Sequence, residues 1–201
     1  MFGWKEILDF WFGELDKHGL PDSYHRNRWF RSTRTFDREI RRRFFTMVLI
    51  ASEGGLDHWR SIAGGVLAEI ILLDQFTRHI HRGSELAFGH DQQARQVCRA
   101  AMAVGLDTQL TGLMRAFFYM PLQHSERRED QQTGVACFEQ LVASEQGVLK
   151  EFLGSFLQSA RDHQAIIERF GRFPHRNRAL GRTSTDDELA YLDASGKRFG
   201  Q

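Results

Sequence analysis

The stretch "VLAEIILLDQF", residues 66–76, is apolar on nearly every side of the helix that its spacing predicts. A helix with that pattern has to be covered by neighbouring elements all round, so we expect it at the centre of the fold. Asp74 lies near its end, where an unpaired carboxylate would be costly. The stretch therefore predicts both a central helix and an acid that needs a partner.

Beyond this stretch, apolar side chains recur three and four positions apart along most of the chain. Thr35 is a predicted N-cap, Pro121 a predicted helix break and Gly171 a predicted C-terminal cap of a long late helix. The sequence shows no convincing run of alternating β-branched residues. The clearest helical stripes contain Trp4, Ile7, Leu8 and Trp11; Phe36, Ile40, Phe44 and Met47; Ala94, Val97, Cys98 and Ala101; and Leu153, Phe156, Leu157, Ala160, Ile167 and Phe170.

These patterns predict an all-α fold of antiparallel helix pairs joined by short turns that contain glycine. Such pairs stack either as a tetratricopeptide-like right-handed superhelix or as a compact helical array. The sequence has no self-similarity at a period of about 34 residues, so the pattern alone does not choose between them. Composition does not change along the chain, which predicts a single domain over residues 1–192. A capping box from Thr185 to Glu188 opens its last short helix, and residues 193–201 are a predicted flexible tail.

Overall charge and apolar runs exclude several kinds of partner. Lysine and arginine number 27 and aspartate and glutamate 26, so a preference for anions has to be local. The N-terminus lacks the apolar segment of a signal peptide, and no run is long enough to cross a bilayer. Cys98 and Cys137, the only cysteines, cannot build a disulfide framework. We expect a cytoplasmic protein without a membrane partner.

The first polar cluster is "LLDQFTRHIHRG", residues 72–83. Asp74, Arg78 and Arg82 are spaced four apart, which places them on one face if the helix continues that far. The three side chains are candidates for binding a ligand. In the alternative interpretation, Asp74 simply pairs with Arg78 for structural reasons.

The second polar cluster is "MPLQHSERRED", residues 120–130. Ser125 is a predicted N-cap, with Glu126 in the first turn of the helix that follows. Capping does not explain His124, which lies at a helix N-terminus where an anion could settle. A histidine beside a carboxylate is a candidate general base, so His124 and Glu126 are candidate catalytic residues.

The third polar cluster is "RFGRFPHRNRALGR", residues 169–182, which holds five arginines, one histidine and no acid. A loop is where functional side chains are commonly carried, and guanidinium groups bind carboxylates and phosphates in a fork. His163 lies on the core side of the preceding helix. Alternatively, the arginines cap helix ends and pair with acids of other helices. The candidates here are His163, Arg172, His175, Arg176 and Asn177.

Metal and nucleic-acid sites are weaker interpretations of the same clusters. His124, Glu126, His163 and His175 are ligand types, but none stands at zinc-site spacing, so we predict no metal and no cofactor. A nucleic-acid surface needs a basic groove several nucleotides long, whereas this chain has one short basic loop.

Four motifs together resemble one protein family: "DFWFGE" at 9–14, "LLDQFTRHIHRG" at 72–83, "PLQHSE" at 121–126 and "RFGRFPHRN" at 169–177. The family is a mainly bacterial domain of unknown function, and the likeness runs from about residue 4 to about residue 192. It implies an all-helical tetratricopeptide-like fold and supplies no activity, substrate or cofactor. Where the family usually reads Phe-Pro-Arg-Asn, this chain has Phe-Thr-Arg-His, so Thr77 and His79 depart from it.

Three functional hypotheses follow from the polar clusters. The first is one pocket for a small carboxylate or phosphate, with arginines as the clamp and His124 or His175 moving protons. Catalysis in that pocket is undecided, since the sequence has no motif for a nucleophile or a phosphate loop. The second is a tetratricopeptide-like module that binds an acidic peptide or a partner protein. The third is that the clusters only lock the late loop onto the central helices.

The single-pocket hypothesis predicts that Arg78, His124 and His175 converge in space. The sequence does not give an oligomeric state. A homodimer is one expectation, because tryptophan and phenylalanine side chains near the N-terminus could contact a second subunit.

Overall fold

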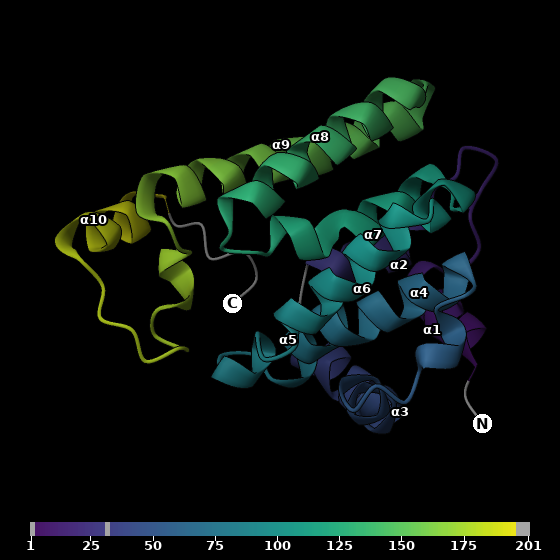
Figure 1. Cartoon of the computed structure of the whole chain (residues 1–201), viewed down its shortest axis with the longest axis horizontal. Coiled ribbons are helices and arrows are strands. Elements are labelled where there is room, and N and C mark those ends of the chain that lie inside the picture. The colour runs from purple at the N-terminus through teal and green to yellow at the C-terminus, as the bar shows by residue number, and fades with distance from the viewer. Residues whose placement is uncertain (1–2, 31–32, 196–201) are drawn as a thin grey trace.

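The computed structural model describes residues 3–30 and 33–195, and over these residues the fold is all-helical, as predicted (Figure 1). Extended pairing within them is limited to an isolated bridge between Leu15 and Pro21. The α-helices are α1 (Trp4–Phe12), α2 (Ser23–Phe30), α3 (Arg34–Ser52), α4 (Ala63–Ile70), α5 (Thr77–Ile80), α6 (Asp91–Ala103), α7 (Gly112–Gln123), α8 (Arg128–Ser144), α9 (Gly147–Phe170) and α10 (Asp186–Ser195). Short 3-10 turns are η1 (Asp57–Trp59), η3 (Glu85–Ala87), η4 (Leu106–Gln109) and η5 (Pro174–Arg176).

The stretch quoted first forms the centre of the molecule. Helix α4 passes directly into η2 (Ile71–Phe76), which is π-helical, and then into α5. Helices α1, α3, α6 and α7 pack against this segment, which is covered as its apolar pattern requires (Figure 1). The prediction of a central helix is confirmed, although its π-helical turn was not expected.

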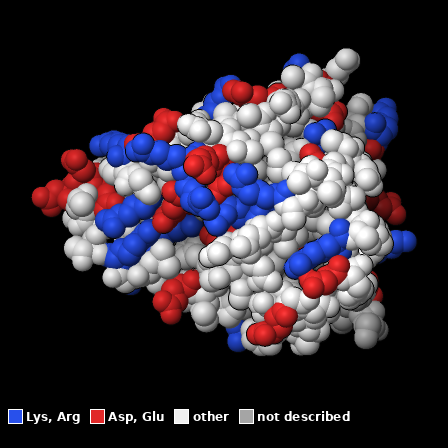
Figure 2. Space-filling view, viewed as in Figure 1, with Lys and Arg blue, Asp and Glu red and all other residues white. Residues whose placement is uncertain are grey.

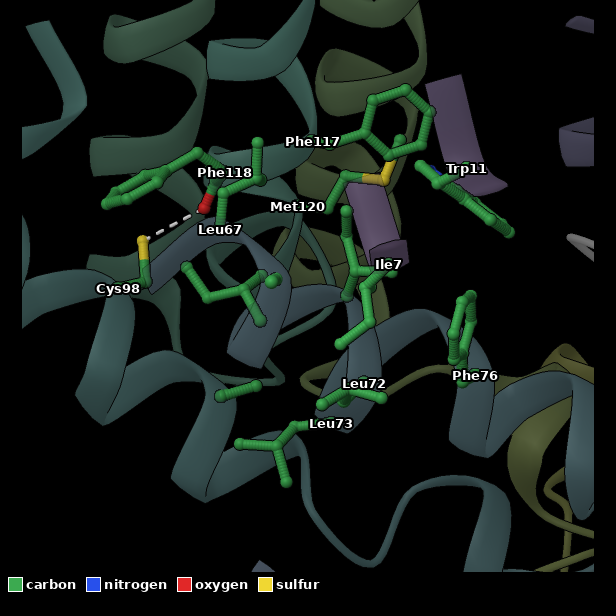
Figure 3. Packing of buried hydrophobic residues seen from close by; sticks show 14 of the residues in the cluster. Ile7, Trp11, Leu67, Leu72, Leu73, Phe76, Cys98, Phe117, Phe118 and Met120 are labelled. Atoms are coloured by element: carbon green, nitrogen blue, oxygen red, sulfur yellow. Dashed lines mark hydrogen bonds between the residues drawn. The ribbon is translucent and has the colours of Figure 1, made fainter. Parts of the chain in front are cut away.

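Aromatic side chains fill the space between the central segment and the helices around it (Figure 3). The ring of Phe117 on α7 lies 4.7 Å from that of Trp29 and 5.8 Å from that of Trp11. Phe10, Trp11 and Phe12 of α1 are all buried in this core. These three side chains therefore pack inside the chain, and the expectation of a homodimer stays a prediction.

Helices α8 and α9 form an antiparallel pair beside α7, and α9 ends next to α10 (Figure 1). The end of α9 follows the sequence prediction, because Gly171 adopts φ 70°, a left-handed conformation in which its N–H reaches the carbonyl of Ile167. No helix in the described ranges has the length and apolarity of a membrane span.

Local predictions at α3, at α7 and at the end of the chain were wrong. Thr33, rather than Thr35, caps α3, because its hydroxyl accepts the N–H of Phe36. Pro121 lies inside α7 instead of ending it. Proline has no N–H, so the helix loses one backbone hydrogen bond at Pro121. The N–H of His124 still bonds to the carbonyl of Met120 and closes the last turn.

The third correction concerns the end of the chain. Residues 193–195 belong to α10, which the predicted capping box opens, so the helix continues three residues further than expected. The rest of the predicted tail, residues 196–201, lies outside the described residues.

Removing the aromatic centre should destabilise the protein strongly. Phe117→Ala deletes a side chain that is 1% exposed, so we expect a loss of about 3–5 kcal/mol in the free energy of unfolding. Urea denaturation followed by circular dichroism measures this loss. Leu49→Ala on α3, where the side chain is 48% exposed, is the control and should change the free energy by less than about 1 kcal/mol. Equal losses in the two variants would contradict the packing described.

Candidate functional site

Asp74 is the centre of the polar structure, with no exposure to solvent and three side-chain partners. Its carboxylate accepts hydrogen bonds from Gln75 Nε2 at 2.5 Å, from Arg78 Nη2 at 3.3 Å and from His124 Nδ1 at 2.7 Å. Asp74 lies in the π-helical turn, and such turns inside α-helices are frequent at functional sites. The alternative in which Asp74 only pairs with Arg78 accounts for one of these three contacts.

Asp74 and His124 form a carboxylate–imidazole pair. Burial alone would raise the pKa of Asp74, but attraction to His124 and Arg78 outweighs it and holds this pKa well below its ordinary value. Burial lowers the pKa of His124, and attraction to Asp74 offsets only part of that effect. Near neutral pH the carboxylate is therefore ionised and the imidazole neutral. Because the carboxylate can only accept, the proton of His124 lies on Nδ1.

Asp91, the first residue of α6, joins two arginines that lie far apart in the sequence. One carboxylate oxygen accepts from Arg78 at 2.8 Å, and the other accepts from Arg176 at 3.1 Å. Arg176 also donates to the backbone carbonyl of His124 at 2.9 Å. Burial lowers the pKa of Arg176 to about 10, because attraction to Asp91 does not make up for it.

Two further histidines lie next to this group. His163 on α9 is buried, as its place on the core side of the helix predicts, and its Nδ1 lies 2.7 Å from the carbonyl of Ser159. Its ring lies 6.1 Å from that of His124 and 5.4 Å from that of Phe173, which in turn lies 5.4 Å from the ring of His175. Burial lowers the pKa of both His163 and His175 to about 3, so both rings are neutral.

We call this group the arginine–histidine cluster. It brings together residues from the central segment, the start of α6, the end of α7, the middle of α9 and the turn η5. All three polar clusters of the sequence contribute to it, and Arg78, His124 and His175 lie in the same neighbourhood. Its members are Asp74, Arg78, Asp91, His124, His163, His175 and Arg176.

Arg82, a candidate from the first cluster, lies in a different network. Helix α5 ends at Ile80, so the four-residue spacing that relates Arg82 to Arg78 no longer places them on one face. Arg82 instead forms a two-bond pair with Asp37 of α3, at 2.9 and 3.1 Å, beside His79.

Three other candidates hold the late loop, residues 171–185, in place. Glu126 accepts two hydrogen bonds from Arg182, at 2.9 and 3.0 Å, and one from the N–H of Phe173. Arg172 and Asn177 both donate to Glu188 at the start of α10. Figure 2 shows basic and acidic side chains next to one another on the side where Figure 1 places α10 and this loop. This arrangement matches the structural alternative for these three residues.

The predicted cap at Ser125 was wrong. Helix α8 begins at Arg128, and the hydroxyl of Ser125 donates to Asp130 at 2.6 Å. Glu126 consequently lies before the helix and not in its first turn.

Sequence reasoning missed three contributors to the site. Asp91 is the most important, because it joins Arg78 to Arg176. Asp91 stands at the first position of a helix, which the sequence allows one to predict. An acid at this position is common because it interacts favourably with the helix dipole, so it did not indicate a binding site. Gln75 bonds to Asp74, and the ring of Phe88 lies under both guanidinium groups, at 5.3 and 4.6 Å. No sequence pattern separated these two from neighbouring residues.

The chemical capacity of the cluster follows from its groups. Two largely buried guanidinium groups can hold a carboxylate or a phosphate, and an oriented neutral imidazole can accept a proton. Within the described ranges, no three His, Cys, Asp or Glu side chains are grouped so that they could hold a metal ion. The fold and the cluster together define an all-helical protein with a buried arginine–histidine site.

The chain belongs to the family described as "Bacterial protein of unknown function (DUF924)", whose model matches residues 7–196. Among solved structures it is similar to a protein of unknown function, ATU0120, from Agrobacterium tumefaciens. The two are 32% identical and superpose with a TM-score of 0.81, and the match covers 95% of this chain and 97% of the other. The search of curated proteins gives no match.

The buried histidines predict that acid destabilises the protein. Unfolded His163 takes up a proton near pH 6.5, whereas the folded protein resists this until about pH 3. The unfolded state therefore binds more protons between these values, and stability falls as the pH drops below about 6.5. For His163 the fall approaches about 1.4 kcal/mol per pH unit. Urea denaturation between pH 7.5 and 4.5 measures it.

His163→Gln should flatten this pH dependence by about the contribution of one histidine. His18→Gln, which changes an exposed histidine, should leave the slope as it is in the wild type. A His163→Gln protein with the wild-type slope would contradict the neutral, buried state of the ring.

Proposed function

We propose that the protein binds a small anion, through a carboxylate or phosphate group, at the arginine–histidine cluster. The observation that supports this proposal is the meeting of two largely buried guanidinium groups at one place, with the side chains of Arg78 and Arg176 12% and 6% exposed. The arginines come from the central segment and from the late loop, and Asp91 lies 85 residues before Arg176. Buried charges are costly, and an anionic ligand that pairs with them would repay part of that cost.

The donors of the two arginines support the proposal further. In the described residues, the Nε atoms of Arg78 and Arg176 are buried and have no hydrogen-bond partner. A buried N–H left in this state costs about 1–3 kcal/mol, which an acceptor on a ligand would recover. The guanidinium group offers a planar set of donors that suits carboxylate and phosphate oxygens.

Asp91 indicates what kind of group fits. Its carboxylate lies between the two guanidinium groups, with one oxygen on each, so a ligand carboxylate has a matching arrangement of donors. The side chain of Asp91 is 16% exposed, so this position faces solvent in part. A ligand would reach the arginines from the side on which Asp91 lies and would compete with it.

The alternative is a tetratricopeptide-like right-handed superhelix that binds an acidic peptide or a partner protein. That function needs cationic side chains spread along an exposed surface. The arginines of the cluster are instead largely buried and lie together around Asp91. A cleft of about 590 Å³ between the end of α3 and the start of α6 presents Glu53 and Asp57 as well as Arg60, which does not favour an acidic ligand. The small-anion site is therefore the better-supported proposal, and we place it in a cytoplasmic protein.

A ligand screen tests the proposal by thermal unfolding. Phosphate, succinate and a hexapeptide of aspartate and glutamate are added separately at constant ionic strength, so that general screening does not contribute. A small anion at ten times its Kd should raise the Tm of the wild type by about 3–6 °C. Arg176→Lys keeps the charge but loses the fork, and it should lose most of this shift.

Arg127→Lys, which changes an arginine that is 63% exposed, is the matched control and should respond as the wild type does. Stabilisation by the peptide alone would favour the interaction module instead. Equal shifts in Arg176→Lys and the wild type, or no shift with any of the three ligands, would overturn the small-anion proposal.

A further inference from the structure

We infer that the Asp74–His124 pair makes this site catalytic, with His124 Nε2 as the general base in the hydrolysis of a small ester that carries a carboxylate or phosphate group. This inference rests on the anion-binding function proposed above. The inference adds a reaction to anion binding and gives Asp74 and His124 different roles. His124 acts on the reacting atoms, whereas Asp74 positions it.

The geometry leaves one ring nitrogen for this chemistry. Both bonds between His124 and Asp74 use Nδ1, at 2.7 and 3.0 Å from the two carboxylate oxygens. No hydrogen bond to Nε2 occurs within the described part of the chain, and the side chain of His124 is 15% exposed. A carboxylate that holds Nδ1–H fixes both the tautomer and the ring orientation, so that Nε2 is an acceptor.

Asp74 is suited to hold the ring and not to titrate. Its carboxylate has partners on three side chains, those of Gln75, Arg78 and His124, and it is completely buried. A carboxylate with this many donors remains ionised over the working pH range. It also stabilises the imidazolium ion that forms when Nε2 accepts a proton.

The groups around His124 set its protonation. Asp74 of η2 and Asp91 of α6 favour the charged ring, whereas Arg78 of α5 disfavours it. His163 of α9 and His175 of η5 are themselves held neutral by burial. Since burial outweighs the attraction to the carboxylates, the ring is neutral and able to accept a proton near neutral pH.

Water is the nucleophile that the site allows. Within the described residues, the hydrogen bonds of the His124 ring go to Asp74, and none joins the ring to a hydroxyl or a thiol. The hydroxyl of Ser125 donates to Asp130, that of Ser159 accepts from Gln123, and the thiol of Cys98 lies in the core against the carbonyl of Phe118 (Figure 3). A covalent intermediate on serine or cysteine is therefore not supported by the arrangement.

The reaction proceeds as follows. His124 Nε2 takes a proton from water while the water oxygen forms a bond to the carbonyl carbon or phosphorus of the ester. The bond from that atom to the leaving oxygen then breaks, and the imidazolium returns its proton to the leaving oxygen. Arg78 and Arg176 hold the anionic group of the substrate, and this binding positions the ester bond beside His124.

The test uses the mono-4-nitrophenyl ester of succinic acid, with 4-nitrophenyl acetate as the neutral ester. Wild type should hydrolyse the anionic ester at least about tenfold faster, and His124→Gln should lose about 100-fold or more in kcat. Arg176→Lys should mainly raise KM, because it weakens binding of the anionic group. His18→Gln changes an exposed histidine far from the cluster in sequence and serves as the control.

Asp74→Asn distinguishes positioning from a purely structural role. The attraction of Asp74 raises the pKa of His124, so its removal should move the acid limb of the pH–rate profile to lower pH while kcat falls. A structural role alone would lower the amount of folded enzyme and leave the position of that limb unchanged.

A second measurement applies to the wild type and does not depend on any variant folding. Diethylpyrocarbonate acylates neutral, accessible imidazole nitrogen, and mass spectrometry identifies the modified residue. His124 should react faster than the buried His163, and succinate should protect it. An unreactive His124 would overturn the inference.

The two proposals fail in different ways. If anions stabilise the wild type in an Arg176-dependent manner but His124→Gln hydrolyses the ester as fast as the wild type does, the catalytic inference is wrong and binding stands. If neither stabilisation nor hydrolysis depends on the cluster, both proposals are wrong.

Discussion

A completely buried carboxylate, that of Asp74, imposes the main constraint on this molecule. An isolated ionised group in such surroundings is prohibitively costly, so the fold has to supply hydrogen-bond donors and positive charge. Arg78, one turn further along the same segment, provides a positive charge and a hydrogen-bond donor. His124, at the end of α7, provides a second donor. The central segment and α7 are thus joined by a polar contact as well as by the aromatic core.

A comparison within the protein shows what sets this cluster apart. Asp130 at the start of α8 is also a buried carboxylate with two arginines, Arg95 and Arg99, and it also accepts from Ser125. Arg99 is 44% exposed, so water solvates much of that group. The ion pairs of Asp130 with Arg95 and Arg99 are accounted for as a structural contact between α6 and α8. In the arginine–histidine cluster the side chains of Arg78 and Arg176 are only 12% and 6% exposed, and three histidines lie nearby.

The sequence was sufficient for most of the fold because apolar spacing and caps are local signals. The central helix, the buried face of His163 and the glycine end of α9 all follow from residues a few positions apart. The site was predictable only in part. That the three polar clusters meet was an inference from residue type, whereas the separation of Arg82 depends on where α5 ends, which the sequence did not mark. Asp91 was missed because its role exists only after segments 85 residues apart come together.

The π-helical turn has a consequence for how the site and the fold are encoded. A π-helical ring contains one residue more than an α-helical ring, so such a turn absorbs an additional residue while the helices on both sides keep their direction. Loss of one codon between Ile71 and Phe76 would let the segment become ordinary α-helix, with α4 and α5 still packed on their neighbours. The angle of Asp74 around the helix, and with it the direction of its carboxylate relative to His124, would then depend on which residue is lost. The helices could in this way keep their packing while the polar contact changes.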